Sequence, residues 1–285
     1  MSDQKPRPAW SAQFASDALR ELDSIGPLGG IDREWAWGGS RGAGIRVAVV
    51  DSGIESSHPA IMGAVRSEVA IEYDPEAEDQ VRIVPNDEPE DFTGHGTACA
   101  GIIHNIAPEA EIFSVRVLGK QLTAKAIQFA AGVRWAIEND MQVVNLSLST
   151  SRAQYYGLFH KLTDEAYFKN VMLVSAVNNY PVPSYPSLYS SVISVAAHDS
   201  PDPFTFYYNP APPVEFGAPG IDIEVPWLDK STCVTTGNSF ASPHMAGIVA
   251  LIVAKHPRLT PFQVKTILYA TASNARMPEE SLAPE

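Results

Sequence analysis

Short apolar runs rich in β-branched residues alternate with segments of helical character along most of this chain. The runs lie at residues 45–50, 111–118, 143–149, 171–177 and 191–197. Continuous apolar runs of this length are typical of parallel strands that are buried on both faces. Apolar residues at helical spacing lie at 123–139, 158–169 and 260–272. This repeated strand–helix order predicts an α/β fold of three layers, with a mostly parallel central sheet and helices on both faces.

The segment 246–254 is apolar or small at every position, which predicts a buried helix. Ser239 would lie at the N-terminus of this helix, where free backbone N–H groups and the helix dipole favour developing negative charge. Pro243 has no N–H group, so the Ser239 carbonyl lacks its usual donor four residues further on. Taken alone, Ser239 would be an ordinary N-cap of a core helix.

The 285 residues are 45% hydrophobic, which suits one large globular domain or two small ones with an ample core. We predict an N-terminal extension at 1–25, one domain at 26–275 and a loose tail at 276–285. The extension either is flexible or docks on the body and masks a cleft. The net charge of −13 argues against a nucleic-acid partner, and no apolar run is long enough for a membrane partner to be expected.

Less regular parts of the sequence give weaker expectations. A short helix is predicted at 12–22, and an acidic loop with one strand at 81–84 is predicted for residues 67–91. The sequence Gly-Ala-Pro-Gly at 217–220 predicts a turn. Trp35 and Trp37 are expected to anchor the glycine-rich segment around them by packing.

The N-terminus and the cysteines bear on the compartment. The first eight residues are polar and have no apolar core of a signal peptide. Cys99 and Cys233 are the two cysteines, and two do not make a disulfide framework, which agrees with a reducing compartment. If Met1 is the native start, these features predict a cytoplasmic protein.

Asp51 and His95 both stand in glycine-associated turns. Asp51 follows the first apolar run, and the carboxyl ends of central strands are where α/β folds place functional groups. His95 lies between Gly94 and Gly96 at the head of a small-residue helix, so backbone approaches closely on both sides. Taken alone, Asp51 would cap a turn and His95 would be structural.

Together these segments resemble the subtilisin-like serine peptidases, the subtilase family. The similar blocks are Val49–Ile54 with Ser57–Pro59, Gly94–Thr97 with Ala100–Gly101, and Gly237–Gly247. Aspartate, histidine and serine occur in the chain order that subtilisins have. The resemblance covers about residues 30–273 and implies a subtilisin-like fold, so the predicted domain at 26–275 is expected to be a peptidase domain.

The resemblance implies a catalytic role for three residues. Ser239 would be the nucleophile, His95 the general base and then acid, and Asp51 the group that holds the imidazole tautomer. It also implies Asn179 as the side-chain donor of the oxyanion hole, beside the Ser239 backbone N–H. The family has Gly-Asn here and this chain has two asparagines, so Asn178 is the alternative that counting from the preceding strand disfavours.

Subtilases bind substrate as an extended strand between two edge segments, which implies a peptide or protein partner. The residues expected in these segments are Leu118, Gly119, Leu146, Ser147, Leu148 and Ser149. Ser149 stands where a glycine usually opens the specificity pocket, so a narrower or differently shaped pocket is expected. Asn238 and Phe240 replace the threonine and methionine that are common beside the nucleophile, and Phe240 is expected to reshape the leaving-group side.

The resemblance implies no cofactor and no catalytic metal. The segment 103–108 has no acidic oxygen ligands, so the calcium loop of secreted subtilisins is expected to be absent. Cys99 lies four residues after His95 on the same helix face. It is either a small buried side chain or a thiol whose modification displaces His95.

The predicted function is a serine endopeptidase that acts through an acyl-enzyme intermediate. A narrower version is a maturation protease that removes a leader from a precursor peptide, suggested by the small size and by the lack of an evident signal or pro-domain. The alternative is a catalytically inactive subtilase fold that acts as a peptide-binding module. A lipase or esterase is a third candidate, but the Gly-x-Ser-x-Gly elbow is missing around Ser239.

Overall fold

A computed structural model describes residues 8–15, 17–19, 30–61, 63–86 and 90–275. The tail predicted at 276–285 and the first seven residues of the predicted extension lie outside the described residues.

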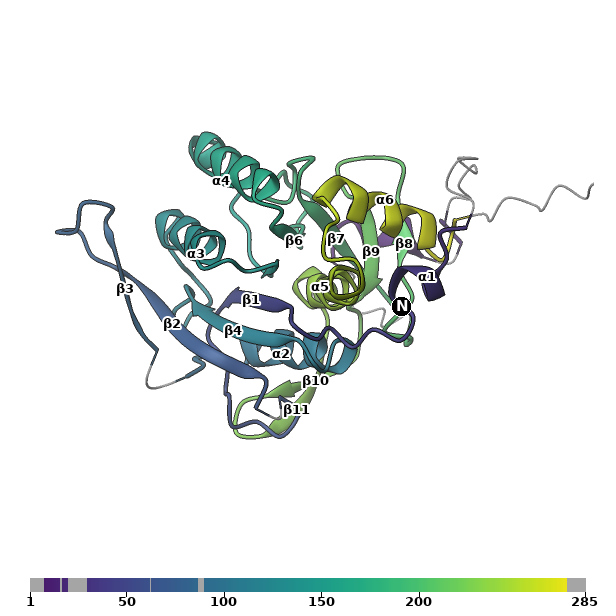
Figure 1. Cartoon of the computed structure of the whole chain (residues 1–285). Coiled ribbons are helices and arrows are strands. Elements are labelled where there is room, and N and C mark those ends of the chain that lie inside the picture. Colours follow the sequence, from purple (N-terminus) through teal and green to yellow (C-terminus); the bar gives the residue numbers. More distant parts are fainter. Residues whose placement is uncertain (1–7, 16, 20–29, 62, 87–89, 276–285) are drawn as a thin grey trace, which may run out of the picture.

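A nine-stranded sheet forms the centre of the molecule, in the order β3-β2-β4-β1-β5-β6-β7-β9-β8 (Figure 1). The strands are β1 (Arg46–Asp51), β2 (Val65–Tyr73), β3 (Val81–Pro85), β4 (Glu111–Arg116), β5 (Val143–Leu146), β6 (Met172–Ala176), β7 (Ile193–His198), β8 (Tyr207–Tyr208) and β9 (Phe216–Pro219). All neighbouring pairs are parallel except the outermost pairs, β2 with β3 and β9 with β8. The prediction of a mostly parallel central sheet is confirmed.

Helices cover both faces of this sheet, as predicted. One layer contains α1 (Arg33–Trp37), α2 (His95–Ile106), α5 (Asn238–Lys255) and α6 (Pro261–Thr271), and the other contains α3 (Ala126–Glu138) and α4 (Tyr156–Phe168). Strand β1 shows how the two cores arise, because successive side chains point to opposite faces. Val47 and Val49 pack in the core under α2 and α5, whereas Ala48 and Val50 pack in the core under α3 and α4.

Helix α5 carries Ser239 and is buried on all sides. Its residues from Phe240 to Val253 are all buried, which explains why the segment 246–254 is apolar or small at every position instead of amphipathic. It packs against α2 and against β5, β6, β7 and β9. Over the part of the chain that the structure describes, no helix combines the length and apolarity needed to cross a membrane.

Two sequence expectations are wrong. The strand predicted at 81–84 is present as β3, but residues 67–73 of the predicted loop are also strand, the end of β2, which forms with β3 an antiparallel hairpin that extends from the body in Figure 1. The charged residues of β2 obscured the strand pattern, because its hydrogen bonds come from parallel pairing with β4 and antiparallel pairing with β3. The turn predicted at 217–220 is largely strand β9, which pairs with β7. A further hairpin, β10 (Ile223–Trp227) with β11 (Ser231–Thr235), was not expected.

The segment before the peptidase body adopts a 3-10 helix, η1 (Ser11–Phe14), which overlaps only the start of the helix predicted at 12–22; residues 16 and 20–22 of that prediction lie outside the described residues. The Phe14 side chain is 2% exposed and packs with Val177, Ala196 and Val214 at the β6–β7 side of the sheet. Residues 8–15 therefore lie against the body in the structure.

The packing prediction is confirmed for one of the two tryptophans. Trp37 is buried in the core as predicted, whereas Trp35 is 42% exposed and stacks on His256 beyond the end of α5.

Candidate active site

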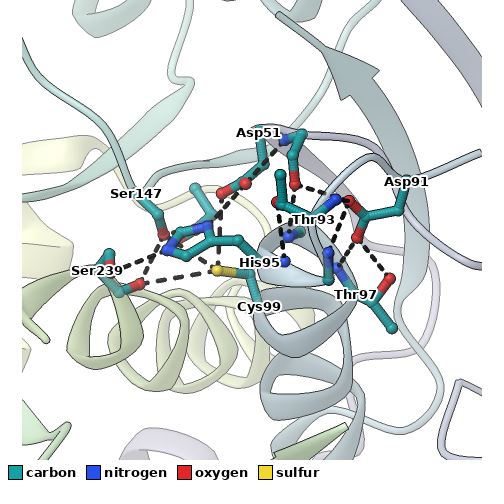
Figure 2. Close-up of polar contacts among 12 residues, drawn as sticks. Asp51, Asp91, Thr93, His95, Thr97, Cys99, Ser147 and Ser239 are labelled. Carbon is teal, nitrogen blue, oxygen red and sulfur yellow. Dashed lines mark hydrogen bonds and ion pairs between the residues drawn. The ribbon is translucent and has the colours of Figure 1, made fainter. Parts of the chain in front are cut away.

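Three secondary-structure elements bring Asp51, His95 and Ser239 together. Asp51 is the last residue of β1, His95 is the first residue of α2, and Ser239 lies in the first turn of α5. His95 Nδ1 lies 2.7 Å from Asp51 Oδ1, and His95 Nε2 lies 2.9 Å from Ser239 Oγ (Figure 2). These three groups, which are 44 and 144 residues apart in sequence, form one hydrogen-bonded series.

The partners of His95 fix its tautomer. The Asp51 carboxylate is fully buried and only accepts hydrogen bonds, so Nδ1 carries the proton and Nε2 is left to accept from Ser239 Oγ. Asp51 Oδ1 also accepts from the Ser52 backbone N–H at 2.8 Å. Burial lowers the pKa of His95, but the charge of Asp51 and its hydrogen bond outweigh burial and raise that pKa well above its ordinary value.

The two glycines beside His95 are required for close packing, as the sequence predicts. A Cβ atom on Gly96 would lie 2.0 Å from the Gly53 carbonyl oxygen. Gly94 has a positive φ of 86°, and a Cβ atom there would lie 2.8 Å from the Trp227 ring. A side chain at Gly96 would therefore push α2 away from β1 and separate His95 from Asp51, and one at Gly94 would displace Trp227 of β10.

Asp91 is a buried carboxylate beside the site whose role the sequence reasoning missed. Its Oδ1 accepts from Ser52 Oγ at 2.8 Å and from two backbone N–H groups in the turn before α2. Its Oδ2 accepts from the Thr97 N–H and hydroxyl (Figure 2). Asp91 thus satisfies free donors at the start of α2 and fixes the helix that begins at His95. An aspartate just ahead of a glycine and a small-residue helix is a recognisable capping signal.

The Ser239 carbonyl accepts a hydrogen bond from a side chain in place of the N–H that Pro243 lacks. Ser147 Oγ donates to this carbonyl oxygen at 2.7 Å, and the Cys99 thiol lies 3.7 Å from it. The Ser147 hydroxyl accepts in turn from Asn145 Nδ2 at 2.9 Å. Ser147 was expected to bind substrate, but its buried hydroxyl is engaged with the helix that carries Ser239.

Asn179 is the asparagine whose side chain contacts the backbone directly before Ser239. Its Oδ1 accepts from the Asn238 backbone N–H at 2.9 Å, which directs Nδ2 away from Asn238. No hydrogen bond to this Nδ2 occurs among the residues that the structure describes. The Asn178 side chain instead closes the following turn, because its Oδ1 accepts from the Tyr180 N–H at 2.8 Å. The Asn179 side chain is therefore linked to the residue before Ser239, whereas the Asn178 side chain is engaged in its own turn.

The other residues expected to bind substrate differ in their placement. Leu118, Leu148 and Ser149 line a pocket of about 570 Å³. The Leu146 side chain is fully buried in the core, because it points into the sheet face under α3 and α4. Gly119 is half-buried and donates its N–H to the Thr123 carbonyl.

Phe240 forms a wall against the histidine. Its ring centroid lies 5.0 Å from that of His95, and its side chain is 4% exposed. The bulky residue that was expected to reshape the leaving-group side is therefore packed against the imidazole.

Asp51, His95 and Cys99 could in principle hold a metal ion, since their ligand atoms lie within 4.8 Å of one another. Asp51 Oδ1 and His95 Nδ1 are, however, hydrogen-bonded to each other, and Cys99 Sγ already contacts the second Asp51 oxygen at 3.7 Å. Burial raises the pKa of the Cys99 thiol, which disfavours the thiolate that a metal needs. The donor set fits a proton-transfer series better than a metal centre.

The parallel α/β fold and the linked carboxylate, imidazole and hydroxyl define the class as that of a serine hydrolase. Comparison with known proteins specifies the family. Residues 42–283 match the sequence model of the subtilase family. The chain therefore belongs to the subtilase family, whose members are subtilisin-like serine peptidases, hydrolases that act on peptide bonds.

Individual relatives agree with this assignment. The chain is 33% identical to minor extracellular protease Epr of Bacillus subtilis, over 82% of this chain and 36% of that protein. It is 31% identical to a thermostable alkaline protease of Halalkalibacterium halodurans, over 81% of this chain and 63% of that protein. It is 28% identical to subtilisin DY of Bacillus licheniformis, over 83% and 86%. The chain thus spans only about a third of the first relative and less than two thirds of the second.

The fold also matches a solved structure. The crystal structure of a cold adapted subtilisin-like serine proteinase superposes with a TM-score of 0.65 at 25% sequence identity, covering 87% of this chain and 92% of that one. The expected subtilisin-like architecture is confirmed.

Proposed function

We propose that this chain is a serine endopeptidase that cleaves peptide bonds through an acyl-enzyme intermediate. The observation that carries the proposal is the hydrogen-bonded series from Asp51 through His95 to Ser239, at 2.7 and 2.9 Å. A serine hydroxyl is a weak nucleophile until a base takes its proton, and His95 Nε2 is placed to do so.

In the first half of the reaction, Ser239 Oγ attacks the scissile carbonyl carbon while its proton passes to His95 Nε2. The new imidazolium is stabilised by the buried Asp51 carboxylate. The carbonyl oxygen becomes an oxyanion, which accepts hydrogen bonds from Asn179 Nδ2 and the Ser239 backbone N–H. His95 then gives its proton to the departing amine, the C–N bond breaks, and Ser239 is left as an ester.

In the second half, water attacks the ester and loses a proton to His95. The tetrahedral intermediate collapses, Ser239 Oγ regains that proton, and the carboxylic acid product leaves. The position of Ser239 at the start of α5 adds the positive end of the helix dipole to both oxyanion steps.

A fluorophosphonate probe tests the nucleophile, because it labels only a serine that a neighbouring base activates. We expect the wild-type protein and the control Ser190→Ala, at an exposed serine, to be labelled, and Ser239→Ala to remain unlabelled. Hydrolysis of a fluorogenic peptide amide should follow the same pattern. If neither wild type nor control is labelled, the chain is an inactive fold that binds peptides, and the proposal fails.

We further propose that the natural substrates are selected precursor peptides from which a leader is removed. The support is the pocket of about 570 Å³ that Leu118, Leu148 and Ser149 line. The β2–β3 hairpin also contributes to its lining, beyond the two segments expected to bind substrate. Tyr73 and Gln80 of the hairpin line it together with Lys125 and Arg152. Such a pocket would recognise a defined side chain upstream of the cut.

Replacing the hairpin tip at 74–80 by a two-residue turn tests this selectivity. We expect the shortened protein to cut a preferred peptide much less well while its cleavage of unfolded casein is unchanged. Equal loss on both substrates, or no loss on either, would contradict a role of the hairpin in selection.

We also propose that the protein acts in the cytoplasm. The support is chemical, because Cys99 and Cys233 are free thiols in the structure. Fractionation of cells that express the native gene with an epitope tag would test this, and recovery from the medium would refute it.

A further inference from the structure

Asn238, the residue directly before Ser239, is fully buried and links several segments by its side chain. Its Oδ1 accepts from the Ala197 backbone N–H at 2.9 Å. Its Nδ2 faces three backbone carbonyls at 3.1, 3.2 and 3.4 Å, those of Ala9, Asn178 and Val177. The side chain thereby joins the N-terminal segment to the end of β6, to the loop that follows it, and to β7.

Asn238 and the N-terminal segment each form one hydrogen bond with Asn179. The Asn238 backbone N–H donates to Asn179 Oδ1 at 2.9 Å, and the Ala9 N–H donates to the Asn179 carbonyl at 2.8 Å. Asn179 is otherwise an exposed residue in a loop. Its backbone position and the orientation of its amide therefore both depend on these neighbours.

Residues 8–15 are firmly anchored elsewhere on the body, so they can act as a support. The buried Phe14 ring fills the space over Gly217, where an added Cβ atom would lie 2.5 Å from the ring. The Gln13 side chain accepts a hydrogen bond from Asn209. The segment is thus fixed to the sheet within a few residues of its contact with Asn179.

We propose that Asn238 and the segment 8–15 form a brace that positions the Asn179 amide for the oxyanion. The inference rests on the proposed function, because it assigns the support of a donor used in that reaction. An oxyanion donor helps only if it is aimed in advance at the site where charge develops. Asn238 and Ala9 are positioning residues, since neither side chain reaches the reacting atoms.

A double-mutant cycle in kcat tests whether Asn238 acts through Asn179. We expect Asn179→Ala to lower kcat about 10²- to 10³-fold, and Asn238→Ala to lower it about ten- to hundredfold with KM changed by less than about twofold. In the Asn179→Ala background, Asn238→Ala should cause no further loss of kcat. A purely structural role would give the same loss in both backgrounds, and this result would overturn the proposal.

The N-terminal half of the brace has its own test, which also serves if Asn238→Ala does not fold. Ala9→Pro removes the N–H that donates to Asn179, and we expect it to lower kcat by about threefold or more. Ala12→Pro makes the same change in the first turn of η1, at an exposed residue with no Asn179 contact, and should leave kcat unchanged. Equal activity of the two variants would refute a role of the segment.

The wild-type protein separates this inference from the proposed function. If wild type neither reacts with the fluorophosphonate nor cuts peptides, the proposed function itself fails. If wild type is active and the effects of Asn179→Ala and Asn238→Ala simply add, only the brace is refuted. Thermal unfolding of each variant, compared with Phe159→Leu in the remote core under α4, would show that a lower kcat does not follow from lower stability.

Discussion

Ser147→Ala should expose the cost of placing a proline one turn after the nucleophile. The Ser239 carbonyl has no helical donor because Pro243 lacks an N–H, and Ser147 Oγ supplies the missing hydrogen bond at 2.7 Å. Removing the hydroxyl leaves that carbonyl with the weak thiol donor of Cys99 at 3.7 Å. It also deprives the buried Asn145 Nδ2 of its acceptor.

The structure sets the size of the effect. A buried polar group without its partner costs about 1–3 kcal/mol. The Asn145 amide is buried, whereas the Ser239 carbonyl is only partly buried and keeps the Cys99 contact, so its share lies at the lower end. We expect Ser147→Ala to lower the free energy of unfolding by about 2–3 kcal/mol, and kcat to fall because the start of α5 is less well fixed.

Pro243→Ala provides the matched test, since it restores an N–H four residues after Ser239. In the wild-type background the carbonyl already has its donor, so little gain is expected. In the Ser147→Ala background the new N–H should recover about 1 kcal/mol, the part due to the carbonyl. Urea unfolding with unchanged m-values would measure all four proteins. Strict additivity of the two substitutions would refute the compensation between Ser147 and Pro243.

Other predictions concern ionisation and the thiol. Asp51→Asn removes the carboxylate that raises the pKa of His95. The acid limb of the pH profile of kcat/KM should therefore move to lower pH, and kcat should fall roughly 10⁴-fold. An acid limb at the wild-type pH would contradict this. Burial lowers the pKa of His244 to about 4, so the unfolded chain takes up its proton first as pH falls from about 6.5. Between pH 6.5 and 4, His244 should therefore lower the free energy of unfolding by about 3 kcal/mol, in addition to a similar contribution from His198, whose pKa burial also lowers to about 4. Urea titrations should show a decline that is smaller by this amount in His244→Gln and unchanged in the exposed control His160→Gln. An organomercurial should inhibit wild type and spare Cys99→Val; equal inhibition would show that this thiol is not the target.

The parts of the fold that the sequence predicted are those that depend on local pattern. The strand ending at Asp51 and the final helix with Thr260 as N-cap follow from apolar periodicity and capping chemistry, and both are present. The strands that were missed depend on their partners. Strand β2 carries charged residues on an otherwise apolar run and is held by β4. Strand β9 contains Gly217 and is held by β7 and β8.

For the site, the contacts among Asp51, His95 and Ser239 could be predicted because each residue has a local signature beside it. Glycines flank His95 and a small-residue helix follows Ser239. The hydrogen bonds around these three residues could not be predicted, since they join a side chain to the backbone of a distant segment. The position of Pro243 in the sequence predicted that the Ser239 carbonyl would lack its helical donor. Nothing in the sequence indicated that Ser147, which lies 92 residues away, supplies the replacement.

The residue directly before the nucleophile shows the same dependence on a distant segment. Asn238 has an amide where relatives commonly have a threonine, and an amide supplies both an acceptor and two donors. Those donors reach the backbone of Ala9, which the chain can place there only because Phe14 is anchored over Gly217. Loss of the segment 8–15 would leave the Nδ2 of Asn238 with one carbonyl fewer while it is fully buried. The amide at position 238 and the docked N-terminal segment therefore stabilise each other, since each satisfies a polar group of the other.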